Sequence, residues 1–232
     1  MLSTKFTYTG VGSRDIPHDV FVRMMMFGYM ACKDGATLRS GKATGSDTAF
    51  QLGHEMYLRQ YPQEDKRMEI YTVNDYPDNR TYLTSACDIE GRDTPAFQTF
   101  CIKKCKEIHP LKHKLKGKAL QLHARNILQV VGQYCNEPSD MCVYFTREDQ
   151  YGDLTGGTAT AAKYSAEIGV PSYNILTDKG DDRVRQLWNA YTNPTTASDE
   201  LRSAIKWAYQ IGDADIKNRI RAGINALGLF GE

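Results

Sequence analysis

Short strand-like segments and longer helix-like segments alternate along most of this 232-residue chain. Strands that are each followed by a helix pair in parallel, and the helices then cover the sheet. The sequence therefore predicts an α/β fold, a Rossmann-like open parallel sheet with helices on both faces. The expected strands are 6–11, 36–39, 68–73, 140–145 and 170–175, and the helices follow from about 15, about 46, 96, about 120 and 156.

The last part of the chain changes character, because it carries two amphipathic helical stripes and no further strand. Residues 1–178 are expected to form the α/β domain, with a polar loop insertion at about 74–95 over one edge of a site. Residues 179–232 are expected to form a helical extension that packs on this domain or joins subunits of a homo-oligomer. The two stripes are Leu201, Ile205 and Ala208, and then Ile216, Ile220, Ile224 and Leu227.

Charge and hydropathy exclude several classes of protein. Lysine and arginine total 29 against 28 acidic residues, a formal net charge of +1. This balance disfavours a generic polyanion binder, whose affinity comes from neutralising phosphates. No stretch approaches the ~20 apolar residues of a membrane span, and the first ten residues lack a secretory pattern. The six cysteines are expected to be free thiols in a cytoplasm.

Three loops of small residues each follow an expected strand and precede an expected helix: 10–14, 40–47 and 156–158. Ligands of open parallel sheets bind at the carboxyl ends of the strands. Glycine lets the backbone approach a phosphate, and free N–H groups at a helix start bind the anion. Arg14 and Arg39 add planar guanidinium groups for phosphate or carboxylate. The loops therefore predict a site for a small anion.

Two common nucleotide-binding motifs fail on spacing. A Walker A loop ending in Gly41-Lys42 would need a glycine at Ala36 and a serine or threonine at Ala43. The first loop has Asp15 where the dinucleotide fingerprint needs its third glycine. Neither a P-loop NTPase nor an ordinary NAD dehydrogenase is supported, and no cofactor is expected.

These residues resemble the SLOG superfamily, which joins the DNA-processing DprA proteins and the Lonely Guy phosphoribohydrolases. The resemblance covers roughly residues 5–176 and is closest to the DprA-like single-domain proteins of bacteriophages. It implies a Rossmann-like fold whose glycine loops hold a nucleotide or nucleotide-derived ligand. It rests on Gly-Val-Gly-Ser-Arg at 10–14, Leu-Arg-Ser-Gly at 38–41, Gly-Ser-Asp at 45–47, His-Ala-Arg-Asn at 123–126, Gly-Gly-Thr at 156–158 and Gly-Val-Pro at 169–171.

The loops and the resemblance together nominate a set of ligand-binding residues, none of them catalytic. Asp47 has an alternative interpretation as a helix cap. Arg125 and Asn126 lie off the apolar stripe of their helix and have an alternative as a solvated face. The nominated residues are Gly10, Gly12, Ser13, Arg14, Arg39, Ser40, Gly41, Gly45, Ser46, Asp47, Arg125, Asn126, Thr146, Gly156, Gly157 and Thr158.

One position departs from the phosphoribohydrolase pattern. Those enzymes carry a glutamate a few residues after the glycine pair, whereas this chain has Lys163 there and Ala159 at the third glycine. A lysine cannot supply the carboxylate that cleaves a glycosidic bond. The departure disfavours that hydrolase activity and favours a site that holds an anion.

Two further patterns have both a functional and a structural interpretation. Cys101, Cys105, His109 and His113 recur every four residues, but four ligands spread along a helix cannot converge on one metal ion, so no metal is expected. Seven lysines lie within 103–118, either as a solvated helix face or as an electrostatic funnel toward an anion or single-stranded nucleic acid.

Three hypotheses for the function follow. The first is non-catalytic binding of a nucleotide or ADP-ribose-like small molecule. The resemblance extends it to a phage anti-defence sponge, acting in the host cytoplasm, that sequesters a host immune signalling nucleotide of the cyclic ADP-ribose type. The second is DprA-like single-stranded DNA binding in recombination. The third is hydrolysis of a nucleotide or N-glycosidic bond, with Asp75, Asp88 or Glu90 of the 74–95 loop as the missing carboxylate.

Overall fold

A five-stranded, fully parallel sheet lies at the centre of the computed structural model, which describes residues 6–64, 67–72, 95–109, 113–187 and 198–229. The strand order is β3-β2-β1-β4-β5. This confirms the predicted Rossmann-like α/β fold, with strand positions close to those expected from the sequence. The strands are β1 (Thr7–Gly12), β2 (Thr37–Ser40), β3 (Met68–Ile70), β4 (Met141–Phe145) and β5 (Ser172–Asn174).

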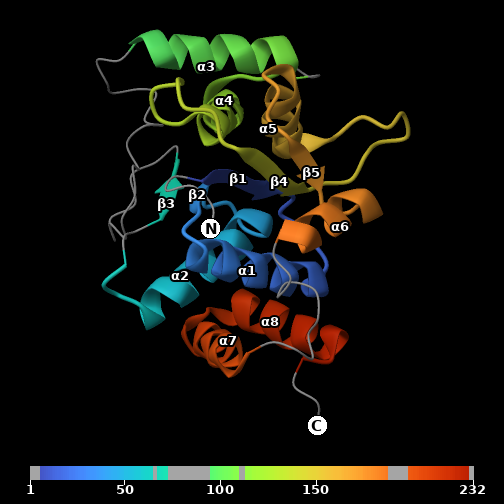
Figure 1. Cartoon of the computed structure of the whole chain (residues 1–232). Coiled ribbons are helices and arrows are strands. Elements are labelled where there is room, and N and C mark those ends of the chain that lie inside the picture. The colour runs from blue at the N-terminus through green and yellow to red at the C-terminus, as the bar shows by residue number, and fades with distance from the viewer. Residues whose placement is uncertain (1–5, 65–66, 73–94, 110–112, 188–197, 230–232) are drawn as a thin grey trace.

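Helices cover both faces of the sheet in successive layers (Figure 1). One face is covered by α1 (His18–Lys33), α2 (Ser46–Gln60) and α6 (Asp178–Leu187). The other is covered by α4 (Gly117–Val131) and α5 (Gly156–Glu167), with α3 (Pro95–Ile108) outside them. Two helices, α7 (Asp199–Ile211) and α8 (Ala214–Leu227), form an outer layer on the first side.

Apolar side chains on the two faces of the sheet form two separate cores, and the inner strand β4 is buried along its whole length between them. Val143 belongs to the core beneath α1 and α2, whereas its neighbour Cys142 belongs to the core beneath α4 and α5. In the first core the ring of Phe27 meets two other rings edge to face. Its centroid lies 5.3 Å from that of Tyr8 and 5.8 Å from that of Phe50. Such pairs add to the stabilisation from burial alone.

Helices α1 and α2 approach each other at a pair of glycines, Gly28 and Gly53. A Cβ added at Gly53 would lie 2.1 Å from the carbonyl oxygen of Met25, and one added at Gly28 would lie 2.5 Å from that of Phe50. Both obstacles are backbone atoms, which a rotamer change cannot move. The close approach therefore holds α2 firmly against α1.

The C-terminal helices form as their stripes predicted, but they do not cover the sheet. They pack on α1 and α2, and Gly223 of α8 lies so close to α1 that a Cβ there would be 2.3 Å from the carbonyl oxygen of His18. The sequence analysis missed α6, which lies against β5. A role of α7 and α8 in a homo-oligomer stays a prediction.

Helix α1 starts slightly later than the sequence predicts. It begins at His18 and not near residue 15, with Pro17 at the cap position and no side-chain capping bond. Proline suits a helix start because its φ is already helical and it has no N–H to leave unpaired.

Some of the features predicted from the sequence fall partly outside the described residues. Residues 74–94 of the expected insertion, with Asp75, Asp88 and Glu90, lie outside the described residues. Five cysteines are free thiols, while Cys87 lies outside the described part. No helix in the described part of the chain has the length and hydropathy to span a membrane.

Substituting Gly53→Ala is expected to lower the free energy of unfolding by about 1–3 kcal/mol, because the new methyl group meets backbone atoms of α1. An unobstructed Gly→Ala change inside a helix would instead stabilise by about 1 kcal/mol. Urea denaturation followed by circular dichroism measures the difference. The control Ser203→Ala, at an exposed position of α7, is expected to change stability by less than about 0.5 kcal/mol. A Gly53→Ala protein more stable than the wild type would contradict the close packing.

Candidate functional site

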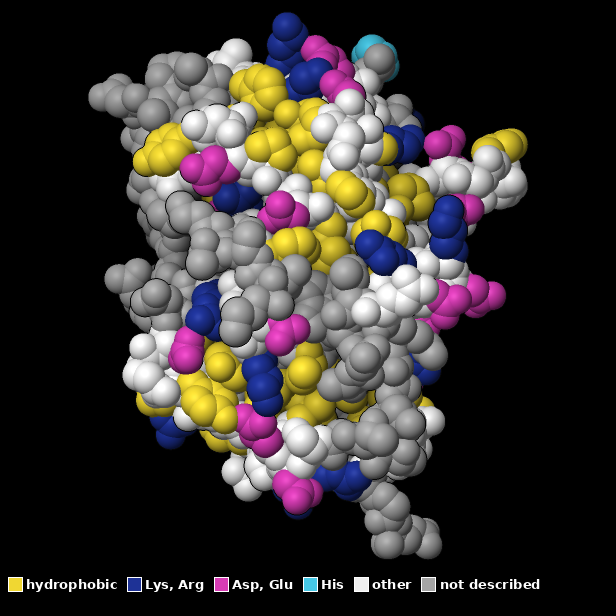
Figure 2. All heavy atoms as spheres, viewed as in Figure 1, with side chains coloured by type: hydrophobic (Ala, Val, Ile, Leu, Met, Phe, Trp, Pro, Cys, Tyr) yellow, Lys and Arg dark blue, Asp and Glu magenta, His cyan; other side chains and the backbone are white. Residues whose placement is uncertain are grey.

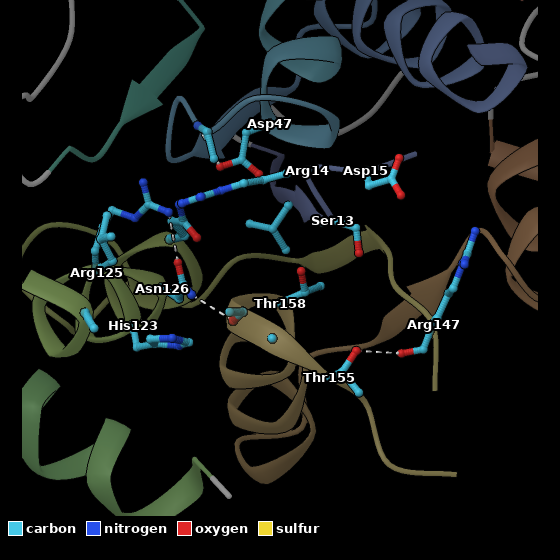
Figure 3. A pocket seen from close by; sticks show the side chains of 18 residues that line it. Ser13, Arg14, Asp15, Asp47, His123, Arg125, Asn126, Arg147, Thr155 and Thr158 are labelled. Atoms are coloured by element: carbon cyan, nitrogen blue, oxygen red, sulfur yellow. Dashed lines mark hydrogen bonds between the residues drawn. The ribbon is translucent and has the colours of Figure 1, made fainter. Parts of the chain in front are cut away.

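A pocket of about 550 Å³ opens beyond the carboxyl ends of β1 and β4. These neighbouring strands are followed by helices on opposite faces of the sheet, α1 after β1 and α5 after β4. Their divergence leaves a crevice, which is where open α/β sheets bind ligands. The pocket is lined by Val11, Gly12, Ser13, Arg14, Asp15, Ala43, Asp47, Ala119, Leu122, His123, Arg125, Asn126, Gln129, Arg147, Thr155, Gly156, Gly157 and Thr158 (Figure 3).

The first two glycine loops press against each other on one side of this pocket. A Cβ at Gly12 would lie 2.3 Å from Oγ of Ser46, and one at Gly45 would lie 2.4 Å from the carbonyl oxygen of Arg14. Gly45 also has a φ of +84°, which favours glycine. The backbone N–H of Ser46 donates to the carbonyl oxygen of Ser13 at 3.1 Å. Glycine is therefore needed here to join the loops, in addition to any contact with a ligand.

Asp47, in the first turn of α2, carries a carboxylate buried between these loops, with a residue exposure of 3%. Its Oδ2 accepts a hydrogen bond from the backbone N–H of Ala43 at 3.3 Å, and the N–H groups of Gly41 and Gly12 also bond to it. Burial raises the pKa of Asp47 to about 6, against the opposing effect of the Arg125 guanidinium and the three N–H groups. The carboxylate of Asp47 thus links the two loops through their backbone N–H groups.

Helix α4 connects the second glycine loop to the third. Arg125 donates through Nη1 to the carbonyl oxygen of Gly41, and Asn126 donates through Nδ2 to that of Gly157 at 2.7 Å. Both side chains are buried, so the alternative of a solvated helix face is wrong for them. They line the pocket, and ligand contact by them stays a prediction.

The N-terminus of α5 opens directly onto the pocket. Gly156 begins the helix with a φ of +70°, and Thr155 before it makes no side-chain capping bond. The first turn of α5 also contains no acidic residue. The N–H groups of this turn and the positive end of the helix dipole therefore face the cavity, an arrangement that binds anions.

Positively charged side chains add to the positive potential at the N-terminus of α5. Arg14 and Arg147 are exposed at the pocket, and no carboxylate among the described residues forms an ion pair with either guanidinium. Figure 3 shows Arg14 reaching across the pocket toward Arg125. Burial, followed by the charges of His109 and Arg125, lowers the pKa of His123 to about 4, so this ring is neutral at pH 7. The lining thus contains three guanidinium groups and two carboxyls, those of Asp15 and Asp47.

Arg39 lies outside the pocket lining, contrary to its nomination. Its Nε donates to Oε2 of Glu69 at 2.6 Å, and its Nη1 bonds to the carbonyl oxygen of Glu137. Glu69 stands directly opposite Arg39 in the pairing of β2 with β3. Because the guanidinium is buried and already paired, it serves the sheet and not the pocket.

Six other nominated residues lie behind the lining. Ser40, for example, donates through Oγ to the carbonyl oxygen of Gly10 at 2.6 Å, which joins β2 to β1. The backbone N–H of Thr146 donates to Oδ1 of Asn174 at 3.3 Å. Ligand contact by this group stays a prediction. The six are Gly10, Ser40, Gly41, Gly45, Ser46 and Thr146.

The described residues of the basic segment and of the cysteine–histidine stripe lie outside the pocket lining. Lys104 pairs with Glu107 at 3.0 Å and with Glu167 at 2.6 Å. On the face shown in Figure 2, basic and acidic side chains are interspersed without a large area of one sign. Cys101 and Cys105 of α3 and His109, which follows this helix, are buried, and no group of three or more metal-ligating side chains gathers among the described residues.

Lys163, at the position of the phosphoribohydrolase glutamate, pairs with Asp153 at 3.2 Å and lies outside the pocket lining. Asp153 belongs to the loop between β4 and α5. The lysine therefore anchors this loop at the rim.

Sequence reasoning missed five polar lining residues: Asp15, His123, Gln129, Arg147 and Thr155. Two signals pointed to three of them. Gln129 follows Arg125 by one helical turn and so shares its face, while Arg147 and Thr155 flank the loop between β4 and α5. Gln129 is fully buried, and neither polar atom of its side-chain amide has a hydrogen-bond partner among the described residues. An unpaired buried amide costs about 1–3 kcal/mol.

Comparison with known proteins gives a structural likeness at low identity. No protein-family model matches the chain, and no curated protein matches it. A similar solved structure is that of DNA processing protein A from Helicobacter pylori, described for its single-stranded DNA binding mode. It is 14% identical, with a TM-score of 0.44, and the match covers 97% of this chain and 83% of that one. A likeness of this strength carries no conclusion about function.

The free energy of unfolding of the Asp47→Asn variant is expected to rise relative to that of the wild type as the pH increases from 4 to 7. The relative increase is expected to reach about 3 kcal/mol. The folded state raises the pKa of Asp47 from 3.8 to about 6. The cost of ionising this carboxyl in the folded protein is therefore absent below pH 4 and complete above pH 6. Urea denaturation of both proteins at pH 4, 5, 6 and 7 measures the difference, with the exposed carboxyl of Asp34 replaced in the control Asp34→Asn. A difference that stays constant across this range would contradict the buried carboxyl.

Proposed function

We propose that the pocket binds the phosphate group of a nucleotide without cleaving the molecule. The observation that carries this proposal is the uncapped N-terminus of α5, which opens onto a cavity where Arg14 and Arg147 have no ion-pair partner among the described residues. Helix N–H groups and guanidinium groups are the two phosphate ligands that proteins use most readily. Both surround the same space here.

The size and the polar lining of the pocket fit a whole nucleotide better than an inorganic anion. A cavity of about 550 Å³ falls in the range that takes small organic ligands. We assign the phosphate to the α5 end of the pocket.

The positions of the acidic side chains favour binding over cleavage. The buried carboxyl of Asp47 is engaged by three backbone N–H groups. Lys163 occupies the position of the phosphoribohydrolase glutamate and binds Asp153. A sponge for a host immune signal, a phage origin and a cytoplasmic location stay predictions from the resemblance.

AMP is expected to bind at least tenfold more tightly than adenosine, because the phosphate meets the α5 N-terminus and two guanidinium groups. Arg14→Gln and Arg147→Gln are each expected to weaken AMP binding by roughly tenfold and to leave adenosine unaffected. Isothermal titration calorimetry measures these affinities, and ion-exchange chromatography of the recovered ligand tests whether it stays intact.

The control for these variants is Arg59→Gln, which removes an exposed arginine from the last turn of α2, at the helix end away from the pocket. It is expected to bind AMP as the wild type does. Equal affinities for AMP and adenosine, or equal losses in all three variants, would refute the proposed phosphate site. Recovery of a cleaved product would refute binding without cleavage.

A second candidate ligand is single-stranded DNA, which the loop between β4 and α5 favours. Tyr151 in this loop is 81% exposed, and Asp149 fixes the turn by accepting from the backbone N–H of Tyr151 at 2.9 Å and of Asp153 at 3.0 Å. Arg147 stands at the base of the same loop and lines the pocket. Proteins bind single strands by stacking the bases on exposed aromatic rings while basic side chains contact the backbone.

If the pocket takes a phosphate of a DNA strand, Tyr151→Ala is expected to weaken binding of a fluorescent dT oligonucleotide by about 5–100-fold, the usual worth of one stacked base. AMP binding is expected to stay unchanged in this variant. Fluorescence anisotropy at two salt concentrations measures the affinity. Tyr134→Ala, which removes another exposed tyrosine, is the control. Oligonucleotide binding that is undetectable in the wild type, or unaffected by Tyr151→Ala, would exclude this candidate.

A further inference from the structure

Two cysteines far apart in sequence lie close together on the side of the molecule that carries α3. The Sγ atoms of Cys101, on α3, and Cys135, in the turn that follows α4, are 3.6 Å apart. Both belong to the core beneath α3, α4 and α5. The pair is separate from the pocket lining and has no part in the proposed nucleotide site.

The two thiols differ in access to solvent. Cys101 is 1% exposed, whereas Cys135 is only half-buried. Cys135 also has a φ of +59°. It lies in a turn in which its own backbone N–H donates to the carbonyl oxygen of Gly132 at 3.1 Å. A reagent in solution therefore reaches Cys135 first, with the Cys101 sulfur directly behind it.

The contact between the sulfurs also affects their reactivity. A hydrogen bond from the Cys101 thiol lowers the pKa of Cys135, against the effect of burial. Burial raises the pKa of Cys32, Cys105 and Cys142. Because the thiolate is the reactive form, Cys135 is the most reactive thiol among these four residues.

We propose that Cys101 and Cys135 form a reversible disulfide when the protein meets a hydroperoxide. The Cys135 thiolate attacks the terminal peroxide oxygen, the O–O bond breaks, and the alcohol (water for hydrogen peroxide) leaves with a sulfenic acid on Cys135. The Cys101 sulfur then attacks this sulfenic sulfur, and water leaves. In sum, two thiols and one hydroperoxide give one disulfide, one alcohol and one water.

The disulfide would tie α3 to the end of α4. It closes a loop that contains all of α4, the helix whose Arg125 and Asn126 hold the second and third glycine loops. Closing such a loop restricts the unfolded chain and so raises stability. Oxidation is therefore expected to raise the urea midpoint of unfolding, and a thiol reductant is expected to restore the original value.

The test treats the full chain with a small excess of hydrogen peroxide, blocks the remaining thiols under denaturing conditions, and maps peptides by mass spectrometry without reduction. The expected result is the loss of two thiols per chain and one crosslinked peptide that joins Cys101 to Cys135. With dimedone present, Cys101→Ser is expected to trap the sulfenic acid on Cys135, whereas Cys135→Ser is expected to leave Cys101 unmodified.

The control Cys32→Ser, which removes a buried thiol from α1, is expected to keep the crosslink and the shift in midpoint. A crosslink between other cysteines would overturn the proposal. So would sulfenic acid on Cys135 in the wild type that persists without a crosslink, or a folded wild type that loses no thiols.

Discussion

The carboxylate of Asp47 is buried where the first two glycine loops meet. The rest of the pocket depends on the hydrogen bonds and the positive charge that compensate this buried group. A buried carboxylate is costly unless hydrogen bonds and a positive charge compensate it. Backbone N–H groups from Gly12, Gly41 and Ala43 supply the hydrogen bonds, and Arg125 supplies the charge. Both loops must therefore converge on one point. Gly12 has to be glycine for this, because a Cβ there would collide with Ser46.

The same arrangement leaves other polar groups free toward the cavity. Asp47 occupies N–H groups of the first two loops, whereas the N-terminus of α5 on the opposite wall carries no capping side chain and no acid. Arg14 and Arg147 stand beside it. The positive potential is thus local, and it requires no excess of basic residues in the whole chain, whose net charge is +1. A small anion in a shaped pocket is the ligand that such a distribution fits.

The sequence predicted the architecture because its signals are local. An unbroken apolar run marks β4 and an apolar stripe at helical spacing marks α4 without knowledge of their partners, and the glycine loops mark the strand ends. Arg39 and Gln129 show where this reasoning stops. Arg39 stands at a strand end like a ligand-binding residue, but its partner is Glu69 across the pairing of β2 with β3. Gln129 reads as an ordinary helix residue until α4 is placed against Gly41. Both roles depend on contacts between residues distant in sequence.

The most direct test of a phosphate site at the N-terminus of α5 is nuclear magnetic resonance of the ¹⁵N-labelled protein during titration with AMP. The account predicts that the backbone amide signals of Gly157 and Thr158 move saturably, with one dissociation constant for both, and that adenosine moves them much less. Binding of AMP that leaves these two amide signals in place, or that shifts signals only outside the pocket, would contradict the account.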